Sequence, residues 1–220
     1  MKQLLNYTFI AGLLALMFFT GCATKDNLEK LPVLGRKNLI PNMDSGVLTY
    51  DTTYHQIADF LFVNQDSMII TNDSFKDKIY VADFFFTTCP TICPIMKAQM
   101  LRVYEEFKNN DHVLILSHTI DPNYDTVALL HDFADRLGVT SEKWHFVTGL
   151  QEEIYDIGQN SYMVSALEDQ NVPGGYIHSG AFILVDKERR IRGMYDGTKE
   201  DQVNRLIKDI PRLIKEYEIQ

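Results

Sequence analysis

Hydrophobic residues in this chain form two kinds of pattern, which alternate along most of its length. Short runs of apolar and β-branched residues predict strands, and apolar residues three or four positions apart predict amphipathic helices. The run at 78–86 is nearly continuous, so we expect a strand that is buried on both faces. The polar turn at 64–66 predicts a hairpin between the runs on either side of it. The other predicted strands are 47–50, 57–63, 67–71, 113–117, 144–148, 181–185 and 191–195.

Helical spacing begins directly after the 78–86 run. The apolar residues at this spacing are Ile92, Ile95, Met96, Met100, Val103, Tyr104 and Phe107. A second helix is predicted between Asp125, as its N-cap, and Gly138, which would close it. A single helical turn is expected at 74–77, a short helix at 150–159 and a last helix at about 203–217, where Pro211 should introduce a kink.

The order of these elements indicates an α/β fold with a central mixed sheet flanked by helices. Cys89 and Cys93 stand where the most apolar strand passes into the first helix. A cysteine pair at this junction of a βαβ unit predicts a thioredoxin-like fold. Residues 161–177 are less regular and predict an extra hairpin or irregular insertion, directly before His178 and the strand at 181–185.

The N-terminal residues have the pattern of a secretory signal. Lys2 precedes an apolar segment, and Gly21-Cys22 resembles the lipidation site of a bacterial lipoprotein, so Cys22 is the predicted lipid attachment residue. An uncleaved membrane anchor is the alternative. In either case the domain would lie in the cell envelope, on the periplasmic side, tied to a membrane. The predicted segments are a signal peptide at 1–21, a lipid-attached linker at 22–46 and the thioredoxin-like domain at 47–220.

Composition sets two further limits. Hydrophobic residues make up 45% of the 220 positions, which is enough for the core of one domain. The net charge is −9, and this argues against nucleic acid as a partner, because nucleic acid requires basic surfaces. Of three cysteines, Cys22 would carry the lipid, which leaves Cys89 and Cys93 as a pair in an oxidising compartment.

The spacing of Cys89 and Cys93 suits two kinds of chemistry. On a first helical turn, residues four apart face the same side. Pro90 suits the first helical position, and the positive end of the helix dipole should lower the thiol pKa values. The two sulfurs could therefore form a redox-active dithiol, able to close a disulfide bond, or hold a metal ion. Thiolates favour soft ions such as Cu(I) and also bind zinc.

Two sulfurs leave a metal site open, so a third ligand is expected. His178 is the strongest candidate, because the loop before the strand at 181–185 lies over the cysteine junction in a thioredoxin-like sheet. His118 follows the apolar run of its strand near the carboxyl end of the sheet and is a second candidate. No ligand role is assigned to His55, His112, His131 or His145.

The sequence of the same loop distinguishes a metal-binding protein from a disulfide-exchange enzyme. Thioredoxin-type oxidoreductases place a cis-proline before this strand and separate their cysteines by two residues. Here the loop contains His178-Ser179-Gly180, and three residues separate the cysteines. Both differences favour a metal site. A peroxidase is disfavoured further, since Phe86 and Ala82 occupy the positions where peroxiredoxins carry Thr and Pro.

Several segments together resemble the Sco/SenC family, over about residues 55–215 and in the family's order. They are 86–94, 117–126, 144–149 and 176–179. The resemblance implies a membrane-tethered, thioredoxin-like copper chaperone that helps to assemble the copper A centre of cytochrome c oxidase. It implies Cys89, Cys93 and His178 as ligands of copper, as Cu(I) or Cu(II). The implied partners are the copper-site subunit of the oxidase and a copper donor protein.

This sequence departs from the family pattern in two places. The Asp-Pro-x-Arg-Asp motif is Asp121-Pro122-Asn123-Tyr124-Asp125 here, without the arginine. Ile177 stands before His178, where the family often has aspartate. Neither change affects a ligand, but both bear on partner docking and on tuning of the metal. Asp83, directly before three phenylalanines, is a further candidate near the site.

The favoured hypothesis is therefore a copper-binding metallochaperone, which is not itself an enzyme. One alternative is a thiol-disulfide oxidoreductase that keeps the copper-site cysteines of another protein reduced. The other is a redox or copper sensor. Cys89 and Cys93 would carry the chemistry in every case.

Overall fold

The seven strands of the main sheet are ordered β11-β10-β5-β6-β7-β3-β4. The structure, a computed structural model, describes residues 30–44, 46–168 and 176–218. Pairing is parallel between β5, β6 and β7 and antiparallel at the other junctions, so the sheet is mixed. These strands are β3 (Leu61–Asn64), β4 (Ile69–Thr71), β5 (Ile79–Phe85), β6 (Val113–Thr119), β7 (Trp144–Thr148), β10 (Ala181–Val185) and β11 (Ile191–Asp196).

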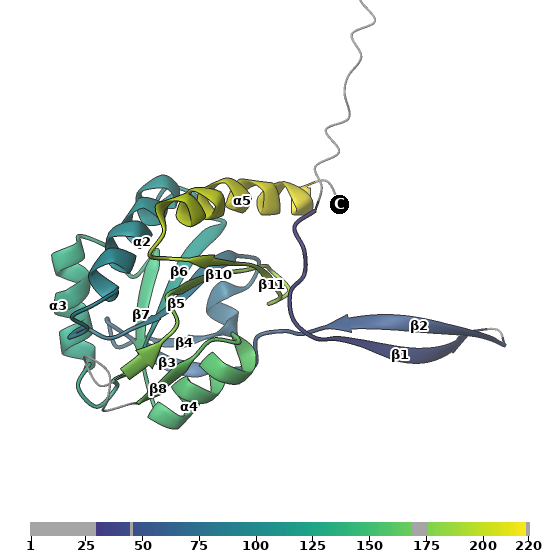
Figure 1. Cartoon of the computed structure of the whole chain (residues 1–220), viewed down its shortest axis with the longest axis horizontal. Coiled ribbons are helices and arrows are strands. Elements are labelled where there is room, and N and C mark those ends of the chain that lie inside the picture. The colour runs from purple at the N-terminus through teal and green to yellow at the C-terminus, as the bar shows by residue number, and fades with distance from the viewer. Residues whose placement is uncertain (1–29, 45, 169–175, 219–220) are drawn as a thin grey trace, which may run out of the picture.

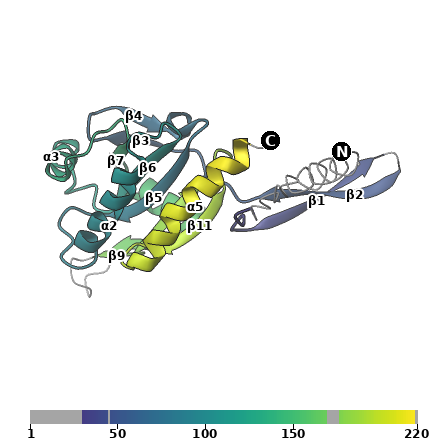
Figure 2. The ribbon, with the colours of Figure 1, turned by 90° about the horizontal axis from the view of Figure 1, so that it is seen from above.

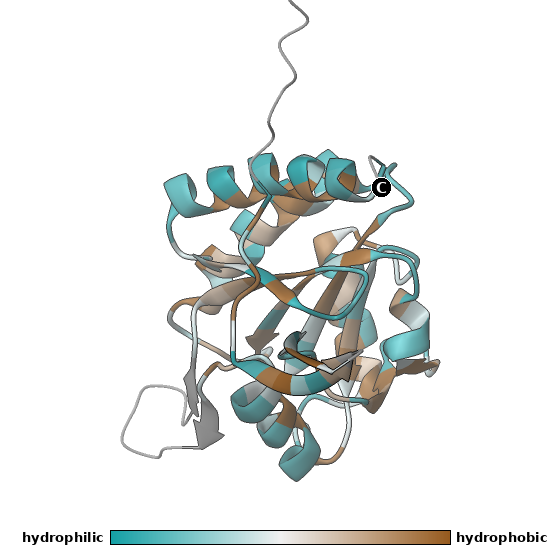
Figure 3. Cartoon of the chain, turned by 90° about the vertical axis from the view of Figure 1, so that its right-hand side faces the viewer, coloured by the Kyte–Doolittle hydropathy of each residue, from teal (hydrophilic) through white to brown (hydrophobic). Residues whose placement is uncertain are grey.

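Helices cover the sheet on its two sides. α2 (Cys93–Phe107) and α5 (Glu200–Glu218) lie side by side over one face, and α4 (Gln151–Asp156) lies on the other side of the sheet (Figures 1 and 2). α5 turns its hydrophobic side toward the sheet and its polar side outward (Figure 3). α3 (Val127–Leu137) packs against β7. This arrangement is a thioredoxin-like α/β fold, as the order of the predicted elements indicated.

The strongest sequence patterns form the centre of this core. Every residue of β5 and of β6 is buried, so the continuous apolar run was correctly predicted to be covered on both faces. The predicted hairpin is formed by β3 and β4, and the predicted helical turn is the 3-10 helix η2 (Asn72–Phe75). α3 ends, as expected, at Gly138, which adopts φ 70°, a left-handed conformation that suits glycine.

Three local predictions need correction. The N-cap of α3 is Thr126, whose hydroxyl accepts a hydrogen bond from Leu129, and Asp125 points into the protein instead. The helix predicted at 150–159 is divided, because α4 passes into a π-helical turn, η3 (Ile157–Ser161). Residues 37–44, which were assigned to a linker, form the strand β1.

Two small antiparallel sheets stand apart from the main one. β1 (Lys37–Asp44) and β2 (Val47–Tyr54) form a long ribbon that projects from the body (Figures 1 and 2). β8 (Ala166–Glu168) and β9 (Tyr176–His178) form the hairpin that was predicted before β10. Within the described ranges, no helix combines the length and apolar character needed to cross a bilayer.

Candidate metal centre

The loop after β5 brings Cys89 and Cys93 together at the carboxyl end of the central strand. The Cys89 amide donates a hydrogen bond to the Phe86 carbonyl at 3.2 Å, which turns the chain immediately after the strand. Cys93 is the first residue of α2, so Pro94 lies within its first turn and Pro90 lies before the helix. Pro90 therefore does not have the predicted helical position. A turn followed by a helix start, and not one helical turn, brings the two sulfurs together.

Both thiols are buried, with 7% of Cys89 and 5% of Cys93 exposed to solvent. The pKa of Cys93 is raised, first by its hydrogen bond with Cys89 and then by burial. A backbone hydrogen bond at Phe86 and the charge of Lys97 oppose this shift but do not reverse it. The prediction that the helix terminus lowers the thiol pKa is therefore wrong for Cys93. Loss of the proton needs a compensating positive charge, because burial penalises the thiolate.

His178 reaches this region through the short hairpin that ends at β10. Its backbone pairs with Ala166 in the β8–β9 ladder, and the next residue, Ser179, donates its amide proton to the Ser165 carbonyl at 2.9 Å. Gly180 lies against the residue before Cys93, since a Cβ built on Gly180 would stand 3.6 Å from Ile92 Cδ1. The chain two residues after His178 thus packs against the start of α2. The side chain of His178 lies outside what the structure describes, as does Cys22.

The second histidine candidate, His118, lies in the hydrophobic core. Its ring stacks on Phe84 with 4.8 Å between the ring centroids, and it also contacts Phe60, Phe62 and Tyr162. Both ring nitrogens are buried without a hydrogen-bond partner among the described residues. Burial lowers the pKa of His118 to about 3. The described side chains contain no group of three or more His, Cys, Asp or Glu residues placed to hold a metal ion.

Asp83, the acidic candidate, takes part in a buried ion pair beneath α2. Lys97 Nζ lies 2.8 Å from Asp83 Oδ2 and 3.1 Å from Ser117 Oγ. Ser117 also donates to Asp83 and accepts a hydrogen bond from the Trp144 indole at 2.8 Å. The ammonium group lies over the ring of Phe85, 4.0 Å from its centroid. Lys97 was not among the predicted site residues, although its spacing from Cys93 places it on the buried side of the same helix.

Asp125 holds the start of the cysteine loop. Its carboxylate accepts hydrogen bonds from the Thr87 amide at 3.1 Å, from the Thr87 hydroxyl, and from the Thr119 hydroxyl at 2.5 Å. Burial raises the pKa of Asp125, and these hydrogen bonds oppose the shift. Thr87 stands two residues before Cys89, so the second aspartate of the Asp121–Asp125 motif fixes the path of the loop.

The remaining histidines have structural or surface roles. His145 lies 3.2 Å from the Asn64 amide nitrogen, and His55 lies 2.7 Å from the Ser161 carbonyl oxygen. His131 is exposed and paired with Asp66. His112 is also exposed.

A thioredoxin-like domain with two buried thiols in contact at the end of its central strand defines a class of redox and metal-binding proteins. Within that class the family is shown by its model: the SCO1/SenC model matches residues 49–215. The chain belongs to the SCO1/SenC family. A relative in Bacillus subtilis (strain 168), a SCO1 protein homolog, is 30% identical over 162 residues, which cover 73% of this chain and 83% of that protein.

Solved structures of the family have the same fold. A SCO1/SenC family lipoprotein from Bacillus anthracis has a TM-score of 0.67 and 28% identity, covering 73% of this chain and 95% of the other. BsSco is described with a disulfide switch and as a member of the Sco family of cytochrome c oxidase assembly proteins. Its TM-score is 0.64 and its sequence identity 30%, and the match covers 72% of this chain and 93% of BsSco. Arabidopsis thaliana ScoI, solved with copper bound, has a TM-score of 0.61 and 25% sequence identity, and the match covers 73% of this chain and 98% of the other.

Proposed function

We propose that this protein is a membrane-tethered, copper-binding assembly factor that delivers copper to, or prepares, the copper A site of cytochrome c oxidase. Copper would be held by Cys89, Cys93 and His178. The observation that carries the proposal is the contact between two buried thiols beside the chain segment that follows His178. Two sulfurs and an imidazole are a donor set suited to Cu(I).

The protonation of the thiols also fits a cation. Burial and the Cys89 hydrogen bond raise the pKa of Cys93, so the thiolate is not favoured in the metal-free protein. A bound metal ion deprotonates the thiols that coordinate it, and binding therefore releases protons. Lys97 contributes positive charge from the next turn of α2, and the Asp125 hydrogen bonds hold the loop that carries Cys89.

The sequence and one relative support the setting that we propose for the domain. The predicted lipidation of Cys22 would tie it to a membrane on the periplasmic side, and a relative from Bacillus anthracis is described as a lipoprotein. The proposed partner is the copper-site subunit of cytochrome c oxidase, in line with the assembly role of BsSco. A copper donor protein would load the site.

An anaerobic titration of the reduced protein with Cu(I), in competition with a chelator, tests the ligand set. His178→Ala should weaken copper affinity by roughly tenfold or more, because one of three ligands is removed. His112→Ala, a change at an exposed histidine, is the matched control and should leave affinity unchanged. Equal affinity in all three proteins would exclude His178 as a ligand.

The contact between the thiols also favours a second function, thiol-disulfide exchange with the copper-site cysteines of a partner or a redox-sensing role. BsSco is described with a disulfide switch. The His178→Ala protein separates these functions. Its Cys89–Cys93 pair should still cycle between dithiol and disulfide, and a reductase would keep its turnover while copper affinity falls.

A further inference from the structure

The β1–β2 ribbon has one apolar face and one mainly polar face. Residues that pair directly in the ladder share a face, and faces alternate along each strand. Leu39 pairs with Thr52, Pro41 with Tyr50 and Met43 with Leu48. Together with Lys37 and Tyr54, whose ammonium and ring are 5.5 Å apart, they make up one side.

The opposite side of the ribbon is mostly hydrophilic and has its own hydrogen bonds. Asn42 donates to the Asp51 carboxylate at 3.2 Å, and the Thr49 hydroxyl donates to the Asn42 carbonyl at 3.2 Å. Ile40 and Val47 are the apolar exceptions on this side. The ribbon is therefore amphipathic, a property that a free two-stranded element in water does not need.

The apolar face is open to solvent in the described structure. The exposed fractions are 65% for Leu39, 72% for Met43, 54% for Leu48 and 57% for Tyr50. An isolated two-stranded ribbon is at best marginally stable in water, and a contiguous exposed apolar face marks a contact surface. Figures 1 and 2 show the ribbon extending away from the helices and the main sheet.

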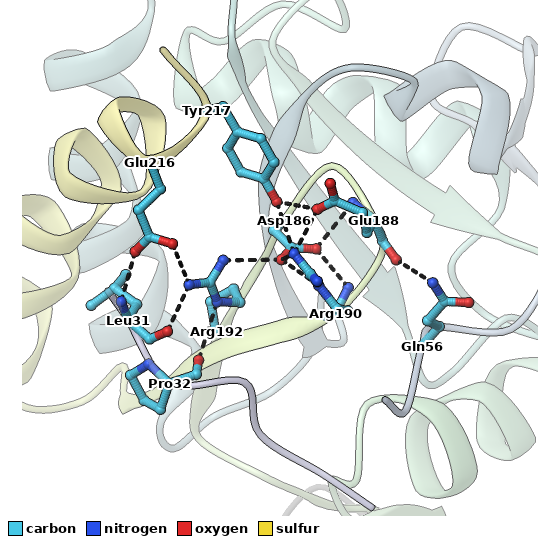
Figure 4. A network of polar contacts seen from close by, with 9 residues as sticks. All are labelled: Leu31, Pro32, Gln56, Asp186, Glu188, Arg190, Arg192, Glu216 and Tyr217. Atoms are coloured by element: carbon cyan, nitrogen blue, oxygen red, sulfur yellow. Dashed lines mark hydrogen bonds and ion pairs between the residues drawn. The ribbon is translucent and has the colours of Figure 1, made fainter. Parts of the chain in front are cut away.

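The segments on both sides of the ribbon are bound to the body (Figure 4). Before β1, the Leu31 amide donates to Glu216, and Arg192 donates to the carbonyls of Leu31 at 2.6 Å and Pro32 at 3.2 Å. After β2, the Gln56 side chain donates to the Glu188 carbonyl at 2.9 Å. The ribbon therefore projects from a base that is bound to the body by hydrogen bonds on both sides.

This attachment lies at the end of the sheet opposite the thiols. The β10–β11 turn supplies Glu188, and Val185, at the end of β10, pairs with Tyr80 near the amino end of β5. Cys89 follows the carboxyl end of β5. A strand of seven residues separates the two ends by roughly 23 Å.

The chain that precedes the ribbon limits how far it can lie from a membrane. Eight residues separate Cys22, the predicted lipid attachment residue, from Leu31, which is bound to Arg192. Even fully extended, this segment spans about 30 Å. A ribbon of eight residues per strand is about 26 Å long, so its apolar face can reach the bilayer surface.

We propose that the β1–β2 ribbon lies on the bilayer with its apolar face, formed by Leu39, Pro41, Met43, Leu48 and Tyr50, against the lipid. The proposal rests on the membrane attachment proposed above. Membrane contact accounts for one-sided apolar exposure, for tyrosines on that side and for the short tether. The thiol site then lies at the far end of the domain from the ribbon. β1 precedes the segment that the family model matches, whereas most of β2 lies inside it.

Tryptophan fluorescence in vesicles tests the contact. The full, lipid-anchored protein is reconstituted into phosphatidylcholine vesicles, a neutral lipid chosen because the net charge of −9 disfavours anionic surfaces. Tyr50→Trp places a reporter on the apolar face, and Thr49→Trp places one on the polar face of the same strand. Trp144, the one native tryptophan, is fully buried and gives the same background in both variants.

Brominated acyl chains should quench the Tyr50→Trp reporter roughly twofold and leave the Thr49→Trp reporter nearly unchanged. Equal quenching of both reporters, or of neither, would overturn the proposal. A blue shift at Tyr50→Trp that needs no lipid and disappears on dilution would instead show a second copy on this face.

Flotation of the vesicles separates failure of the anchor from failure of the ribbon contact. If the protein floats but its reporter is not quenched, the anchor is present and the ribbon does not contact the lipid. If the protein does not float, it has neither the anchor nor the ribbon contact. The Cu(I) titration of the same variants reports on the metal site independently of either result.

Discussion

His118 is held neutral by the fold. Its ring is buried among Phe84, Phe60, Phe62 and Tyr162, and no hydrogen bond from the described residues stabilises the protonated form. The pKa falls to about 3, below the ordinary value of 6.5, because burial penalises the charge. Between these values the unfolded chain binds a proton that the folded protein does not. Stability therefore falls as the pH drops through this window.

The acid sensitivity of the protein should decrease when His118 is replaced by phenylalanine. Each pH unit inside the window costs about 1.4 kcal/mol, so His118→Phe should reduce the loss of unfolding free energy between about pH 7 and about pH 4.5 by roughly 2 to 3 kcal/mol. Urea denaturation at the two pH values measures it. The exposed His112→Phe is the control, and an equal acid loss in both variants would contradict the assignment. The native loss also includes His145, whose pKa burial lowers to about 4.

At the scale of elements, α2 joins the thiol site to the core through an ion pair. Lys97 follows Cys93 by one helical turn and meets Asp83 on β5 and Ser117 on β6. The side chains of Lys97 and Asp83 are 5% and 0% exposed. A buried pair of this kind adds little net stability, but it is costly to break, because the remaining charge stays buried.

Lys97→Met should lower the free energy of unfolding by about 3 to 5 kcal/mol, since it leaves the Asp83 carboxylate without its cation. Combining it with Asp83→Asn removes that charge and should restore much of the loss. Lys108→Met is the control, because it breaks an exposed ion pair with Glu105 at the end of the same helix. It should have little effect on the free energy of unfolding. Urea denaturation of the four proteins provides the measurement. A double variant as unstable as Lys97→Met would show that lost packing, and not the unpaired charge, is the cause.

Elements with one dominant pattern could be predicted from the sequence to within a few residues. β5 and β10 are nearly continuous apolar runs, β7 carries His145 and Thr148 among its apolar residues, and all three lie where they were expected. β1 was missed because prolines and glycines scattered through a polar segment suggested a linker, although Leu39, Pro41 and Met43 stand at every second position as in a strand. The alternation could have revealed it.

The site could be predicted in part, because some of its residues depend on tertiary structure. Cys89 and Cys93 follow from a local motif at a strand-to-helix junction. Asp125 was expected to be an N-cap, and its real partners, Thr87 and Thr119, depend on β5 and β6 being parallel neighbours. Asp83 was a candidate from its position in the sequence. Its ion pair with Lys97 depends on which side of α2 faces the sheet, and this is set by the tertiary structure.

At the scale of the whole molecule, Arg192 joins the N-terminal segment, β11 and α5. It is 4% exposed and lies 3.1 Å from Asp186 and 2.5 Å from Glu216 (Figure 4). It also donates to the carbonyls of residues 31 and 32. One side chain therefore fixes the segment that leads to the ribbon.

Arg192→Met should destabilise the protein by about 3 to 5 kcal/mol, because the buried Glu216 carboxylate loses its cation, while Asp186 keeps its pair with Arg190. The released N-terminal segment should also become a better protease substrate, with faster tryptic cleavage after Arg36 and Lys37 in the folded protein. Arg205→Met, at an exposed position of α5, is the control. Limited proteolysis and urea denaturation together give the result. Unchanged cleavage at Arg36 would show that the segment is held by other contacts.

The separation of β8–β9 from the main sheet has a consequence for hydrogen exchange. The ladder of β8 and β9 is a sheet of its own, so it can open without breaking any pairing of the seven-stranded sheet. Segments of this kind form separate cooperative units with low opening free energies. A copper ion bound through His178 would tie this unit to α2, and the free energy of opening the unit would rise with the logarithm of the free copper concentration once the site is saturated. Slowed amide exchange at β9 would then report occupancy of a site whose sulfur ligands lie on another part of the chain.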